Sequence, residues 1–179
     1  GGWSLGGRLA LEAARLAPER VGRLIVIGGT PGFMQHDDWA EAQPASLLDT
    51  FMQAMAGDPR ATLQRFVALL NQGDTKARAI GRELSRALLS SPLPPTTSLL
   101  TGLDWLRDVD LRQQIPHIAC PTLLIHGEND PLMPLAAARC LADRLPRAQL
   151  AVFPGAAHAP FLNDPECFAR LVGDFLHAA

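Results

Sequence analysis

Apolar residues recur along the chain with two kinds of spacing. From Leu5 to Leu16 they fall three or four residues apart, at Leu5, Leu9, Ala13 and Leu16, and Pro18 follows, which predicts a helix. Residues 24–27 instead form a short continuous run of branched side chains that ends in two glycines. Such a run is typical of a strand buried on both faces of a parallel sheet. The alternation of helix and buried strand indicates a doubly wound α/β fold.

The strand pattern stops at about residue 30 and returns only after residue 112. Four helical stripes lie between, over residues 47–55, 63–70, 77–88 and 99–106, and Gly and Pro separate them. Each stripe needs the sheet or another stripe to cover its apolar side. We therefore expect residues 33–112 to be a four-helix lid, inserted into a core made of residues 1–32 and 113–179.

Strand patterns return at residues 121–125 and 149–153, and a helical pattern follows each of them. The last helix is predicted to open at Asp164-Pro165, a capping residue followed by proline. The fold class predicted is α/β, with parallel strands flanked by helices and a four-helix lid.

Each predicted strand end carries one polar residue of possible catalytic use. Gly2-Trp3-Ser4-Leu5-Gly6 fits G-x-S-x-G, a sharp strand-to-helix turn that exposes a serine hydroxyl, and we expect both flanking glycines to be required sterically. Asp130 follows the strand at residues 121–125, and His158 follows the strand at residues 149–153. Parallel strands bring their carboxyl ends to one edge of a sheet, where open α/β folds bind ligands.

Each of these residues also has an ordinary interpretation. A lone G-x-S-x-G is common in turns, Asp130 before Pro131 could cap the next helix, and His158 could be a solvated loop residue. Their joint placement in the order Ser, Asp, His favours a catalytic triad of Ser4, Asp130 and His158. The Leu5 amide would then be one oxyanion donor. The other histidines are interpreted as structural or solvated.

Composition narrows the function further. A net charge of −2 gives no indication of nucleic-acid binding, and no apolar run reaches the roughly 20 residues of a membrane span. Cys120, Cys140 and Cys167 are far apart, which predicts buried reduced thiols and a cytoplasmic protein. With no metal-ligand spacing and no phosphate loop, we expect no cofactor and no metal, which leaves cofactor-free acyl transfer.

With these motifs placed, the chain resembles the α/β-hydrolase superfamily, and more closely the pimeloyl-[acyl-carrier-protein] methyl ester esterases of biotin synthesis. The stretches that carry the closer resemblance are Gly2-Trp3-Ser4-Leu5-Gly6-Gly7, Pro18-Glu19-Arg20-Val21, Arg65-Phe66-Val67-Ala68-Leu69, Val109-Asp110-Leu111-Arg112 and Ala156-Ala157-His158-Ala159-Pro160-Phe161. The resemblance implies a serine carboxylesterase that removes the methyl group from pimeloyl-carrier-protein methyl ester.

The resemblance also implies partners and binding residues. It places Arg65, Arg78 and Arg82 where the acidic acyl-carrier protein docks, and it implies a monomeric full-length protein. Residues 59–86 carry six basic side chains against two acidic ones, a net charge of +4 that could steer an acidic partner or simply be a solvated helix face. The family resemblance also implies a wall that binds the acyl chain, and this wall consists of Trp3, Leu5, Phe66, Val67, Ala68, Leu69 and Leu70.

The chain starts inside the serine motif, without the strand that such a turn requires and without an initiator methionine. We therefore expect it to be the C-terminal part of a longer protein, with the activity belonging to the parent enzyme and the second oxyanion donor lying upstream. The sequence leaves open whether a signal peptide precedes it. Alternatives to the specific esterase are a general short-chain carboxylesterase acting on small esters, a hydrolase-fold module that binds ligand without turnover, and a non-functional fragment.

Overall fold

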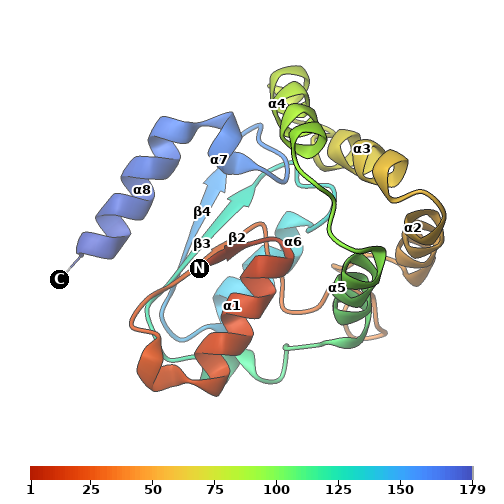
Figure 1. The fold of residues 1–179 in the computed structure, drawn as a ribbon. Coiled ribbons are helices and arrows are strands. Elements are labelled where there is room, and N and C mark those ends of the chain that lie inside the picture. The colour runs from red at the N-terminus through yellow and green to blue at the C-terminus, as the bar shows by residue number, and fades with distance from the viewer. Residues whose placement is uncertain (179) are drawn as a thin grey trace.

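A computed structural model describes residues 1–178 and contains a parallel sheet of four strands. In sheet order these are β1 (Gly2–Trp3), β2 (Leu24–Ile27), β3 (Thr122–Gly127) and β4 (Ala148–Phe153). Leu24 pairs with Thr122, and Thr122 pairs with Ala148, so the strands are in register from their amino ends. The α/β fold with a parallel sheet is confirmed, and all carboxyl ends lie at the same edge (Figure 1).

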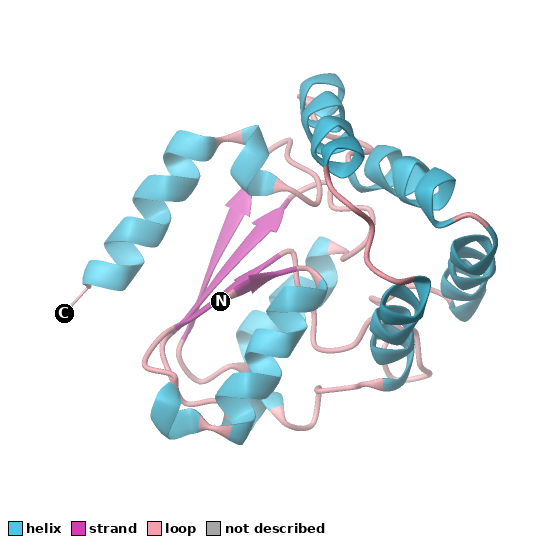
Figure 2. Ribbon diagram, viewed as in Figure 1, coloured by secondary structure: helices cyan, strands magenta, loops and turns pink. Residues whose placement is uncertain are grey.

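Helices cover both faces of this sheet (Figure 2). Helices α1 (Leu5–Leu16) and α6 (Leu135–Arg144) pack on one face, and α8 (Pro165–His177) packs on the other. The short helix α7 (Pro160–Asn163) precedes α8, and 3-10 turns occupy Pro18–Arg20 and Ile115–His117. As predicted, Asp164 caps α8, with its carboxylate accepting from Cys167 N–H at 3.0 Å.

Helix α1 has the predicted length but buries a different face. Leu11 and Ala14 are fully buried against the sheet, whereas Leu9 and Leu16 of the predicted stripe are 50% and 65% exposed. The close approach of α1 to β2 accounts for the difference, because a Cβ on Gly7 would lie 3.0 Å from Val26 Cγ1. Gly7 therefore allows the close approach, and Leu11 and Ala14, on the same side of α1, are buried against the sheet.

Four helices lie between β2 and β3 in sequence: α2 (Ala45–Gly57), α3 (Pro59–Leu70), α4 (Ala77–Ser90) and α5 (Thr96–Asp108). We call them the four-helix segment. They form an arc beyond the carboxyl ends of the strands (Figure 1). Their apolar side chains pack on one another and on residues from the core, as Leu48 and Leu70 do with Met133. The segment therefore covers the edge where the candidate residues lie.

Arg8 of α1 ties the end of the four-helix segment to the core. Its guanidinium is fully buried and donates to the carbonyl oxygens of Leu106 (3.2 Å) and Val109. Burial lowers the pKa of Arg8 to about 10, and the nearby Asp110 partly opposes that shift. The contact fixes the last turn of α5 against the first turns of α1.

The three cysteines are free, but Cys120, Cys140 and Cys167 are partly exposed rather than buried as predicted. Among residues 1–178, no helix has the length and apolar character needed to cross a membrane.

Candidate active site

Ser4 sits at the turn between β1 and α1 in a strained backbone conformation. Its φ of 56° and ψ of −122° make it the one non-glycine residue with positive φ within residues 1–178. Such conformations cost roughly 1–3 kcal/mol and cluster at functional sites. The turn is held by Ser4 N–H, which donates to Ile27 O at 2.8 Å, and by Ser4 O, which accepts from Gly7 N–H at 2.9 Å.

The glycines around Ser4 are not equally constrained. A Cβ on Gly2 would lie 2.1 Å from Gly6 O, so no side chain fits there. A Cβ on Gly6 would meet nothing within 4 Å beyond its own helix. The expectation that both flanking glycines are sterically required is therefore wrong for Gly6, whose Cβ position is open. The tight helix position is Gly7, which faces β2.

Asp130 lies in the turn after β3 and uses its two carboxylate oxygens differently. Oδ1 accepts from the backbone N–H groups of Leu132 and Met133, both at 2.9 Å. Oδ2 lies 2.7 Å from His158 Nδ1. Helix α6 begins later, at Leu135, so Asp130 orders the turn before the helix rather than capping it. The carboxylate is thereby fixed with one oxygen directed at the imidazole.

His158 follows β4 and is fully buried, which contradicts the solvated-loop interpretation. Its backbone is held by two hydrogen bonds: His158 N–H donates to Leu70 O at 3.2 Å, and His158 O accepts from Trp3 Nε1 at 2.7 Å. With Nδ1 on Asp130, the ring presents Nε2 as the second nitrogen. Within residues 1–178, that buried Nε2 has no hydrogen-bond partner.

The turn Gly28-Gly29 after β2 brings Ser4 and His158 to the same place. A Cβ on Gly28 would lie 3.2 Å from His158 Cε1, and one on Gly29 would lie 3.7 Å from Ser4 O. Gly28 also has a φ of 51°, which glycine adopts readily. No hydrogen bond joins Ser4 Oγ to His158 Nε2 in the described residues. Such contacts are often long before substrate binds.

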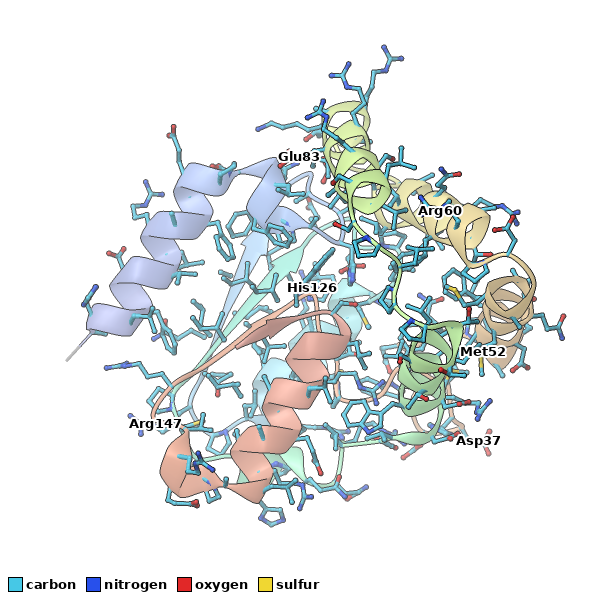
Figure 3. The ribbon with its side chains drawn as sticks, in the orientation of Figure 1. Asp37, Met52, Arg60, Glu83, His126 and Arg147 are labelled. Atoms are coloured by element: carbon cyan, nitrogen blue, oxygen red, sulfur yellow. The ribbon has the colours of Figure 1, made fainter. Side chains whose placement is uncertain are left out.

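His126 is a second buried histidine beside the Asp130 carboxylate. It lies near the end of β3 and is central in the molecule (Figure 3). Its Nε2 is 2.6 Å from Met133 O and 3.6 Å from Asp130 Oδ2. Burial lowers the pKa of His126 from its ordinary value of 6.5, although Asp130 opposes the shift. The sequence places His126 at the end of the strand near Asp130, and its interpretation as a structural or solvated histidine agrees with its burial here.

A cavity of about 260 Å³ opens beside Ser4 under the four-helix segment. Its side chains are apolar apart from Ser4 and Ser98. The amide of Leu5 begins α1 at this point, among the N–H groups that have no partner inside the helix. The cavity is lined by Ser4, Leu5, Phe33, Leu47, Leu48, Phe51, Met55, Leu63, Phe66, Leu69, Ser98, Leu99, Gly102, Leu103, Leu106, Leu132 and Met133.

The predicted acyl-wall residues fall in four places. Leu5, Phe66 and Leu69 line this cavity. Val67 and Ala68 line a separate groove between α3 and α4. Trp3 packs its ring on His158 with a centroid distance of 5.5 Å, and Leu70 is buried in the core of the four-helix segment.

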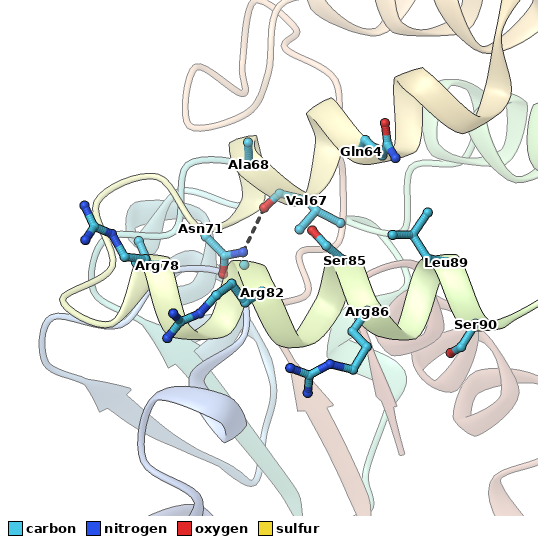
Figure 4. A pocket seen from close by; sticks show the side chains of 12 residues that line it. Gln64, Val67, Ala68, Asn71, Arg78, Arg82, Ser85, Arg86, Leu89 and Ser90 are labelled. Atoms are coloured by element: carbon cyan, nitrogen blue, oxygen red, sulfur yellow. Dashed lines mark hydrogen bonds between the residues drawn. The ribbon is translucent and has the colours of Figure 1, made fainter.

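The groove between α3 and α4 is larger and open, with a volume of about 940 Å³ (Figure 4). Arg78 and Arg82, predicted to dock a partner, lie along it together with Arg86. Arg65 is exposed on α3. Within residues 1–178, none of these four arginines forms an ion pair.

Two residues next to the site were not found from the sequence. Asp74 is buried where the α3–α4 turn meets the loop that carries His158. Asn163 contacts the same carboxylate. The one available signal was that Asp74 is an acidic residue inside a basic stretch. No group of three or more potential metal-ligating side chains is present in the described part of the chain.

A strained serine after a strand and a buried Asp–His pair after later strands, all at one edge of a parallel sheet, define the class of α/β-hydrolases. A model of the alpha/beta hydrolase fold matches residues 1–165, and the chain belongs to this family.

Relatives and one solved structure are similar to this chain to different degrees. The chain is 44% identical over 178 residues to the pimeloyl-[acyl-carrier protein] methyl ester esterase of Aromatoleum aromaticum, covering 97% of this chain and 71% of the relative. It is 40% identical over 174 residues to the protein of that name from Yersinia enterocolitica, covering 97% and 67%. Its fold matches an esterase from Exiguobacterium antarcticum with a TM-score of 0.88 at 23% identity, covering 99% of this chain and 65% of the other. The chain thus spans about two thirds of the length of the proteins it matches.

Proposed function

We propose that the protein containing this chain is a serine carboxylesterase that acts through an acyl-enzyme. The observation that carries the proposal is the buried His158, whose Nδ1 is held by Asp130 at 2.7 Å and whose Nε2 has no partner within residues 1–178. A histidine held in this way, close to the strained turn of Ser4, is arranged to act as a general base.

The reaction follows from these positions. His158 Nε2 takes the proton of Ser4 Oγ as that oxygen attacks the ester carbonyl, and Asp130 stabilises the imidazolium that forms. The Leu5 amide, at the start of α1, supports the negative charge on the carbonyl oxygen. The imidazolium then gives its proton to the leaving alcohol. Water, activated by His158, releases the acid from Ser4.

The substrate proposed is the methyl ester of pimeloyl-acyl-carrier protein, in biotin synthesis. Both relatives described above carry this substrate in their names. A neutral methyl ester and a methylene chain suit a cavity lined by apolar side chains such as Leu5, Phe66 and Leu69. We assign these three to contact with the acyl chain, and retain Trp3, Val67, Ala68 and Leu70 as proposed members of its wall.

The four-helix segment, within residues 33–112, is proposed to be a lid that also docks the carrier protein. Arg65, Arg78 and Arg82 are exposed and make no ion pair among the described residues, so they are free to contact an acidic partner. Their charge would raise the encounter rate more than the final affinity.

The decisive test replaces the nucleophile in the full-length protein. Ser4→Ala is expected to lower kcat on p-nitrophenyl acetate by about 10⁴-fold or more, and to abolish labelling by a fluorophosphonate probe. Ser98→Ala, at the other serine of the cavity, is the matched control and should retain turnover and labelling. Turnover by Ser4→Ala close to that of the unmodified protein would rule out the triad. Absence of labelling in the unmodified protein would favour a module that binds ligand without turnover.

A further inference from the structure

The turn between α3 and α4 is bonded directly to the loop that carries His158. Asp74 in this turn is only 8% exposed. Its Oδ2 accepts from Ala157 N–H at 2.8 Å, one residue before the histidine. Its Oδ1 accepts from Asn163 Nδ2 at 2.8 Å and from Lys76 N–H at 2.7 Å. The carboxylate therefore joins the four-helix segment to the chain on both sides of His158, at Ala157 in the loop between β4 and α7 (the histidine loop) and at Asn163 at the end of α7.

A role of Asp74 in beginning helix α4 would not account for all of these hydrogen bonds. The Oδ1 bond to Lys76 N–H is a local turn contact of the kind that aspartate commonly makes. The Oδ2 bond reaches a residue 83 positions away and has no local counterpart. A buried carboxylate is costly unless its oxygens are satisfied, and here three N–H donors satisfy it without an ion pair in the described residues. Hydrogen bonds to a charged group are also stronger than neutral ones.

The same turn makes two further contacts with the loop. Thr75 N–H donates to Gly155 O at 2.9 Å, and Lys76 Nζ donates to Asn163 O. The end of α3 adds the bond from His158 N–H to Leu70 O. On its opposite side, the loop is held by Trp3 through His158 O. The backbone on both sides of the imidazole is thus fixed by the four-helix segment and by the turn that carries Ser4.

We propose that Asp74 is a positioning residue for His158, through which helices α3 and α4 hold the imidazole in line with Ser4 and Asp130. The proposal rests on the proposed function, because it assigns His158 the role of general base. Asp74 does not touch the reacting atoms. Its effect is to fix Ala157 N–H, and with it the direction in which the histidine side chain leaves the backbone.

The test makes the same change, aspartate to asparagine, before and after helix α3 in the full-length protein. Asp74→Asn leaves one acceptor oxygen for three N–H donors, and because two of these donors bond Oδ1, we expect the oxygen to stay there and the Ala157 bond to be lost. Asp58→Asn makes the same change at the N-cap of α3, where the carboxylate accepts from Ala61 N–H and asparagine caps equally well. We expect Asp74→Asn to lower kcat on p-nitrophenyl acetate by about 10-fold or more, because small displacements of catalytic groups have large effects on rate. KM should change little, and Asp58→Asn should leave both constants unchanged.

Two measurements separate positioning from loss of folded protein. Rates are expressed per active site titrated with the fluorophosphonate, so that unfolded molecules do not count. The low-field proton signal of His158 Nδ1–H reports its bond to Asp130, and it should shift or broaden in Asp74→Asn alone. Asn163→Ala keeps the Ala157 contact and should lose clearly less kcat than Asp74→Asn. An equal loss in Asn163→Ala, or an unchanged proton signal in Asp74→Asn, would overturn the proposal.

The Ser4→Ala variant, measured in parallel, shows whether a negative result refutes the proposed function or only the positioning role of Asp74. If Ser4→Ala keeps its turnover, the proposed function fails and the role of Asp74 fails with it. If Ser4→Ala is inactive while Asp74→Asn behaves like Asp58→Asn, only the positioning role is refuted.

Discussion

At the scale of single residues, the geometry of the site depends on which hydrogen-bond partner each polar atom has. The Oδ1 of Asp130 is occupied by two backbone N–H groups, which leaves Oδ2 directed at His158. A carboxylate fixed by its own turn needs no reorganisation when the imidazole becomes charged, and such preorganisation is a large part of enzymatic rate enhancement. Ordering the turn and holding the imidazole are therefore compatible roles of Asp130, because they use different oxygens.

His126 gives a prediction for stability against pH. Its pKa is lowered by burial, so the unfolded chain binds the proton more tightly than the folded one. The stability contribution is fully present above the ordinary pKa of 6.5 and is lost as the pH falls from there toward the folded pKa. His126→Gln can still donate to Met133 O, and it should remove this loss, which amounts to at most about 1.4 kcal/mol per pH unit.

Urea unfolding between pH 7.5 and pH 5 measures this effect. The slope of the unfolding free energy against pH should be smaller in His126→Gln than in the unmodified protein. His117→Gln, at an exposed histidine, is the control and should keep the original slope. Equal slopes in all three proteins would show that His126 is not a buried neutral group.

The sequence could predict Ser4, Asp130 and His158 as candidates because each follows a strand, and strand ends converge in a parallel sheet. It could not predict Asp74, whose partner Ala157 is brought near by the packing of α3 and α4 on the histidine loop. Nor could it separate Phe66 from Val67, which are neighbours on one helix but face different cavities. Those assignments depend on helix rotation, and an apolar stripe defines rotation only loosely.

At the scale of elements, the end of β3 approaches the backbone of the histidine loop closely. A Cβ on Gly127 would lie 1.9 Å from Ala157 O and 2.6 Å from Ala156 O. Because both atoms are backbone, the loop cannot yield by rotating a side chain. The strand and the loop therefore determine one another's position, and β3 contributes to the placement of His158 as well as Asp130.

Gly127→Ala is accordingly expected to destabilise the protein by about 1–3 kcal/mol or more, as overpacking does. Gly173→Ala is the matched control, because a Cβ there meets nothing within 4 Å and the residue lies in helix α8. That control should stabilise the protein by about 0.5–1 kcal/mol. Urea midpoints at constant m-value measure both. A neutral Gly127→Ala would mean that the loop has room to move.

Element prediction was accurate where proline, glycine and caps mark the boundaries. Helix α2 follows Pro44 and ends at Gly57, which agrees with the Gly and Pro expected to separate the helical stripes, and Asp58 caps α3. The prediction of which face of α1 is buried was wrong, because leucines occur on more than one side of that helix. Contact with the sheet then favours the face with Gly7, Leu11 and Ala14, which allows the closest approach. That choice depends on the partner strand and is not encoded in the helix alone.

At the scale of the whole molecule, charge is distributed unevenly. Residues 59–86 carry a net +4 in a chain of net −2. Arg60 and Glu83 lie on the four-helix segment, whereas Arg147 lies on the opposite side of the molecule (Figure 3). Arg78, Arg82 and Arg86 line the open groove between α3 and α4, which is separate from the cavity that contains Ser4.

This placement predicts that charge reversal on α4 separates large substrates from small ones. Arg78→Glu with Arg82→Glu should lower kcat/KM on an ester carried by acyl-carrier protein on the order of 10-fold, and should leave p-nitrophenyl acetate turnover unchanged. Arg147→Glu with Arg170→Glu changes the net charge equally at exposed sites outside the four-helix segment and should affect neither substrate. Raising the salt concentration should slow the carrier-bound reaction of the unmodified protein more than that of the α4 variant, since ions screen exposed charges. Equal losses on both substrates would place these arginines in the catalytic reaction instead of in docking.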